Sequence, residues 1–171
     1  ELLAGVTFGY ADSDLNVAGG HDSTQINTTY IGLYSSYEVP EWYLDTTLAW
    51  GFSEYDTKRH ITVGSINETA KGNYDGDQIA GGIEAGLNWF RNDWCIQPLA
   101  GFQFVHETQD SYNETGTTSS NLRVSSSSFD SYQSSLGVKL NRQLIHDING
   151  LRILGQLRGR WVHEYGDTYA S

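Results

Sequence analysis

The most constraining feature of the sequence is a period-two alternation of apolar and polar side chains, repeated in segments of roughly ten residues. In residues 42–52, leucine and aromatic residues dominate the even positions, and small or polar residues dominate the odd positions. Further segments of this kind, of which the first two are less regular, cover residues 3–17, 25–39, 78–90, 94–106, 130–140 and 151–162. Successive side chains of a strand point to opposite faces. The pattern therefore predicts an all-β protein with about seven antiparallel strands.

The composition excludes several classes of protein. The net charge is -11, which makes a nucleic-acid partner improbable. No run of 18 apolar residues exists, so the sequence predicts no transmembrane helix, and its first residues do not resemble a signal peptide. A single cysteine, Cys95, rules out an internal disulfide framework, and we expect it to be a small packed residue.

The residues that usually carry chemistry are scattered. No two of the five histidines have metal-ligand spacing, and no cysteine pair accompanies them. Phosphate-binding glycine loops and nucleophile elbows are also absent. The sequence thus predicts no catalytic residues, no metal site and no cofactor.

The lengths of the connections distinguish a membrane barrel from a soluble β-sandwich. Residues 40–41 and 91–93 form very short connections, whereas residues 64–77 and 107–121 form long polar ones, and residues 141–150 are intermediate. Outer-membrane barrels alternate short periplasmic turns with long extracellular loops. We therefore expect the acidic long connections to be solvated loops outside the cell.

Tryptophan placement supports the barrel. Trp42 and Trp50 point to the same face, and a strand tilted near 40° separates them by roughly 20 Å along the membrane normal. This distance approaches the spacing of the two aromatic girdles around an apolar band. The predicted lipid-facing girdle residues are Trp42, Trp50, Trp89, Trp94 and Trp161.

The opposite face of the predicted strands carries glycine, serine, amides and charges. A barrel lumen that holds water accommodates such residues. The predicted lumen-facing polar and charged residues are Asp45, Glu84, Gln97, Gln103, Lys139, Gln156, Arg158 and Arg160. We expect their opposite charges to form a network.

Six short motifs occur in an order that resembles the autotransporter translocator β-domain of type V secretion in Gram-negative bacteria. They are Tyr30-Ile-Gly-Leu-Tyr34, Trp42-Tyr-Leu-Asp45, Gly82-Ile-Glu-Ala-Gly86, Pro98-Leu-Ala-Gly101, Leu136-Gly-Val138 and Trp161-Val-His-Glu-Tyr165. The resemblance implies a twelve-stranded barrel with a helix in its pore. Residues 1–171 then form a partial barrel domain, strands three to nine, and the helix, the first two strands and the last three lie outside them.

The resemblance also implies a function: an outer-membrane barrel that anchors an N-terminal passenger domain and assists its secretion. The implied partners are outer-membrane lipid, the passenger domain and the outer-membrane assembly machinery. Some members of the family cleave their own passenger with acidic lumen residues. Asp45 and Glu84 match two of these positions, but Gly101 occupies a third, so the sequence favours a barrel that is not an enzyme. A different outer-membrane barrel, such as a porin or adhesin, and a soluble extracellular β-sandwich remain alternatives.

Overall fold

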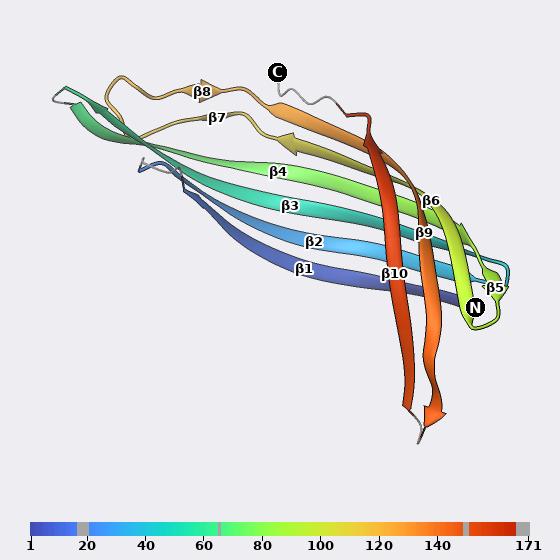
Figure 1. Cartoon of the computed structure of the whole chain (residues 1–171). Helices are drawn as coiled ribbons and strands as arrows, with labels where there is room; N and C mark the ends of the chain where they lie inside the picture. Colours follow the sequence, from blue (N-terminus) through green and yellow to red (C-terminus); the bar gives the residue numbers. More distant parts are fainter. Residues whose placement is uncertain (17–20, 65, 149–150, 167–171) are drawn as a thin grey trace.

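A computed structural model describes residues 1–16, 21–64, 66–148 and 151–166 (Figure 1). It confirms the all-β, antiparallel fold. The ten strands are β1 Leu2–Asn16, β2 Ser23–Glu38, β3 Trp42–Val63, β4 Ile66–Leu87, β5 Trp89–Arg91, β6 Trp94–Gln109, β7 Tyr112–Asn113, β8 Arg123–Val124, β9 Ser127–Ile148 and β10 Leu151–Glu164. Within the described residues, no helix is long and apolar enough to cross a bilayer.

One curved sheet holds all the strands except β7 and β8. Its order is β1-β2-β3-β4-β6-β9-β10, and every pair is antiparallel. The short strand β5 continues β4 along the same edge of β6. Pro98 lies opposite this interruption, and it has no N–H to donate to the ladder. The sheet therefore has the seven neighbouring strand positions that the sequence predicted.

Two connections that the sequence predicted as loops are paired strands instead. Most of residues 64–77 belongs to β4, which pairs with β3 as far as Val63 opposite Ile66. Residues 141–148 belong to β9, which pairs with the start of β10. Both segments are polar, but an antiparallel hairpin satisfies its backbone hydrogen bonds whatever its side chains are. Val17, expected at the end of the first strand, lies outside the described residues.

The strand ends are staggered in one direction across the sheet. The row of paired residues that begins at Leu2 in β1 crosses the sheet to Trp161 in β10. Toward the end of the sheet that carries the short turns, β10 continues beyond this row as far as Leu151, whereas β1 starts at the row. Figure 1 shows the result, because the β9–β10 hairpin projects beyond the ends of β1 to β4. Such a stagger accompanies the strand tilt of a closed barrel.

The β3–β4 hairpin projects from the opposite end of the sheet. We call residues 54–75 the arm, and residues 110–126, which connect β6 to β9, the strap. The strap contains the two-stranded sheet of β7 and β8 and follows the arm (Figure 1). Lys71 and Thr115 form an antiparallel bridge along the edge of β4. The strap thus covers a strand edge that would otherwise be exposed.

Candidate functional site

The register of the sheet separates the predicted lumen and girdle residues onto opposite faces. Asp45 pairs with Glu84, Glu84 pairs with Gly101, and Gly101 pairs with Ser135. Counting by twos from this row places all eight predicted lumen residues on one face, which we call the inner face. The same count places Trp42, Trp50, Trp89, Trp94 and Trp161 on the other, outer face. That these faces meet water and lipid, respectively, remains a prediction.

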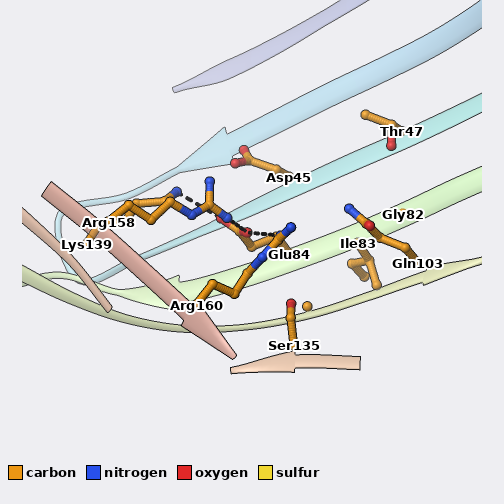
Figure 2. Close-up of a pocket in the computed structure, with 11 residues that line it drawn as sticks. Asp45, Thr47, Gly82, Ile83, Glu84, Gln103, Ser135, Lys139, Arg158 and Arg160 are labelled. Carbon is orange, nitrogen blue, oxygen red and sulfur yellow. Dashed lines mark hydrogen bonds and ion pairs between the residues drawn. The ribbon is translucent and has the colours of Figure 1, made fainter. Parts of the chain in front are cut away.

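The inner face is concave. Arg158 of β10 forms an ion pair with Glu84 of β4, although β6 and β9 lie between the two strands. On a flat sheet, three strand spacings separate such residues by about 14 Å. Curvature brings the two side chains together across the hollow of the sheet, and Figure 2 shows them converging there.

Glu84 is the centre of a charge cluster on this face. Its Oε1 lies 2.8 Å from Nζ of Lys139, and its Oε2 lies 3.9 Å from the guanidinium of Arg160 and is also paired with Arg158. Three cations therefore surround one carboxylate. Its side chain is only 16% exposed, so solvent screens these interactions less than on an open surface.

Tyr43 positions the centre of this cluster, and the sequence did not single it out. Its hydroxyl donates to Oε1 of Glu84 at 3.0 Å and accepts from Nζ of Lys139 at 2.9 Å. The same ammonium lies 4.5 Å from the centre of the ring. Gly86 makes room for the ring, because a Cβ there would overlap it. The only sequence signal was a tyrosine at an odd position of residues 42–52, on the face predicted to line the lumen.

The other acidic residue of the predicted lumen set is held apart from the cluster. Asp45 lies directly opposite Glu84 in register, but it accepts a hydrogen bond from Ser36 at 2.6 Å. In the described part of the chain, no cation lies within ion-pair distance of Asp45. Asp45 and Gln103 line the same hollow as the cluster (Figure 2). The two carboxylates thus differ sharply in their electrostatic surroundings.

The predicted residues Gln97 and Gln156 belong to a row of amides at the end of the sheet that carries the short turns. Asn88 donates to the carbonyl of Val39 at 3.2 Å, and Gln97 donates to Oδ1 of Asn88 at 2.7 Å. Asn141 donates to Oε1 of Gln97 at 2.6 Å, and Gln156 donates to Oδ1 of Asn141 at 2.8 Å. We call Asn88, Gln97, Asn141 and Gln156 the amide row. The sequence did not single out Asn88, which lies within the predicted strand 78–90, or Asn141, which falls in the predicted connection 141–150.

The strap is fixed to the arm by a bidentate ion pair. Nε and Nη2 of Arg59 donate to the two carboxylate oxygens of Glu114 at 3.0 and 2.5 Å, and the backbone N–H of Leu122 donates to the same carboxylate. Glu114 is 7% exposed, which corrects our expectation of a solvated loop residue. The guanidinium of Arg59 holds the pKa of Glu114 below its ordinary value, and that carboxylate raises the pKa of Arg59.

Stacked tyrosines add an apolar contact beside this ion pair. The rings of Tyr55 and Tyr74, on opposite strands of the arm, are 4.7 Å apart and parallel. Tyr112 of the strap stacks on Tyr74 at 4.4 Å. The arm and the strap therefore form one packed unit rather than two independent loops.

The described residues contain no group of three or more histidine, cysteine or acidic side chains placed to hold a metal ion. The charges instead neutralise one another, as in Glu84 with Lys139. The arrangement provides a polar, partly charged surface inside a curved wall.

Comparison with known proteins identifies this wall. The autotransporter β-domain family model matches residues 1–171. The chain belongs to the autotransporter β-domain family. It is accordingly part of a β-barrel of the bacterial outer membrane, as the alternation and the motifs predicted.

Solved structures and curated relatives agree with this assignment. The fold resembles the β-domain of the Bordetella autotransporter Brka, with a TM-score of 0.72 and 24% identity over 99% of this chain and 65% of that one. It also resembles the translocator domain of autotransporter NalP from Neisseria meningitidis, with a TM-score of 0.69 and 16% identity over 94% of this chain and 63% of that one.

The curated relatives are much longer proteins. The chain is 24% identical to outer membrane protein A of Rickettsia conorii over 84% of this chain, but it spans 8% of that protein. It is 26% identical to an extracellular serine protease of Serratia marcescens over 95% of this chain and 15% of that protein. The protease name therefore describes a protein of which the matched region is a small part.

Proposed function

We propose that residues 1–171 form part of the wall of a translocator barrel that anchors a passenger domain in the outer membrane and assists its secretion. The separation of the two faces is the observation that carries this proposal. Charged side chains converge on the concave face, whereas the tryptophans and most exposed apolar side chains belong to the convex face. A closed barrel with this polarity has a wet interior and an apolar exterior.

The inner face supports passage rather than catalysis. Glu84 is paired with cations and Tyr43, and Asp45 is bonded to Ser36, so neither carboxylate is presented as a free general acid or base. A porin or an adhesin barrel would share the polar lumen, but the match to the family favours the translocator. Contacts with lipid and with the outer-membrane assembly machinery follow from this function.

A pair of substitutions at one depth tests the orientation of the wall. Ile83 is exposed on the outer face, and Thr47 is exposed on the inner face of the neighbouring strand. Ile83→Arg, in the full-length protein that carries this chain, should destabilise the barrel by about 2–4 kcal/mol, the cost of arginine on the lipid face near the midplane. Thr47→Arg should cost much less, because the lumen hydrates it.

Two measurements test the effects of these substitutions on folding and on secretion. Heat-modifiable gel mobility reports the folded barrel, and protease accessibility of the passenger on intact cells reports secretion. We expect Ile83→Arg to reduce both and Thr47→Arg to leave the gel shift intact. Equal damage from both substitutions would contradict the proposed orientation. A passenger that reaches the cell surface after the region carrying this chain has been deleted would contradict the translocator function.

A further inference from the structure

The amide row lies beside the short turns and steps once away from the lines of paired residues, although Gln156 and Asn141 pair in register. Gln97 pairs in register with Lys139, yet its side chain bonds to Asn141, two residues further along β9. This step follows the stagger of the strand ends. In a barrel whose strands are tilted, this step reduces the change of depth along the row. It lies next to the charge cluster, on the side of the short turns.

The row is neutral and points in one direction. Each amide donates one N–H to the oxygen of the preceding group, and the series ends at the carbonyl of Val39. A carboxamide has two N–H donors and an oxygen with two lone pairs. Within the described residues, these bonds use one N–H of each amide and leave a second N–H and spare acceptor capacity.

The accessibility of the row rises along its length. Asn88 is 8% exposed and is anchored to the backbone, Gln97 and Asn141 are half-buried, and Gln156 is exposed on the inner face. The buried end fixes the positions of the amides, and the open end presents their unused groups. Such a preorganised row offers both donors and acceptors at a small entropic cost.

We propose that the amide row is a contact site for the main chain of an extended polypeptide that enters the pore. The chemistry of carboxamides matches that of peptide groups, each of which also offers one donor and one acceptor. Such a site accepts any sequence, because it reads no side chain. The charged cluster around Glu84 lies deeper in the pore, and there the lining distinguishes charges. This inference rests on the proposed function and specifies how the translocator receives its substrate.

Site-specific photocrosslinking tests the inference on the full-length protein, with secretion stalled by a disulfide-closed loop in the passenger. Benzoylphenylalanine replaces Gln156, Leu157 or Arg158 in three separate variants. Gln156 is the open end of the row, Arg158 is the next inner position in the charge cluster, and Leu157 is 69% exposed on the outer face. We expect crosslinks to the passenger from positions 156 and 158 and none from 157. The crosslinks from 156 should persist with an unrelated passenger sequence.

The other outcomes separate the two hypotheses. Crosslinks from 158 without any from 156 would overturn the amide site and leave the translocator intact. No crosslinks from either position would overturn both. Crosslinks from 156 to a single passenger segment, lost when the passenger is exchanged, would replace main-chain recognition by a sequence-specific site.

A second variant tests whether the amides themselves make the contact. Gln97→Met keeps the length of the side chain and removes its donors and acceptors. With the probe at position 156, we expect crosslinking to fall about threefold or more, in line with the loss of one neutral hydrogen bond. Gln103→Met, on the inner face but outside the row, is the matched control and should leave crosslinking unchanged. Unchanged crosslinking in Gln97→Met, with normal gel mobility, would overturn the proposal.

Discussion

Removing the charge of Glu84 is the most informative test of the inner face. Glu84→Gln keeps the shape of the side chain and an acceptor for Tyr43, but it leaves Lys139, Arg158 and Arg160 without their carboxylate. Exposed ion pairs contribute about 0–1 kcal/mol, and breaking a buried pair costs about 3–5 kcal/mol. Glu84 and Lys139 are 16% and 15% exposed, between these limits, so we expect a loss of about 2 kcal/mol.

The assay is urea unfolding of the full-length barrel, compared with Asp45→Asn as the control. Within the described residues Asp45 has one hydrogen-bond partner, the neutral Ser36, so its change should cost less than about 1 kcal/mol. A double-mutant cycle with Lys139→Met should show a coupling of about 1 kcal/mol with Glu84→Gln, because the second substitution removes a charge that is already unpaired. Equal losses for Glu84→Gln and Asp45→Asn, with no coupling to Lys139→Met, would refute the idea that the three cations depend on one carboxylate.

Two further predictions concern a packing contact and the strap. Gly86→Ala should lower the free energy of unfolding by about 1–3 kcal/mol, because its Cβ would overlap the ring of Tyr43, whereas Gly159→Ala, with no atom within 4 Å of its Cβ, should have little effect in the same urea titration. The ion pair of Arg59 with Glu114 should make the strap resistant to protease at pH 7 and pH 5. Because the pKa of Glu114 is lowered from 4.5, this protection is present above that value and is lost as the pH falls through the lowered pKa. Glu114→Gln should release the strap at neutral pH in limited proteolysis. Equal cleavage of the variant and the unchanged protein at pH 7 would contradict the idea that this ion pair holds the strap.

The sequence predicted the faces of the strands correctly but not their lengths. A period of two determines which side chains share a face, so Glu84, Lys139 and Arg158 fell on the same face before any pairing was known. Hydropathy determines only where a strand meets an apolar environment. The arm is polar on its exposed face and is stabilised by its own pairing and by the strap, so alternation could not reveal it. Glu114 lies in a polar segment whose contact with the arm is not visible in the sequence, so it resembled a solvated loop residue.

The contacts that define the site depend on register and curvature, which a single sequence does not encode locally. Arg158 reaches Glu84 only because the sheet is concave, and Gln97 reaches Asn141 because the register makes the two residues diagonal neighbours on one face. Both properties follow from the tilt of strands in a barrel. A flat sheet with the same pairing would keep the register but separate Arg158 from Glu84 and leave three cations exposed. The charge cluster is therefore evidence for the curvature itself, and its loss should accompany any change that flattens this wall.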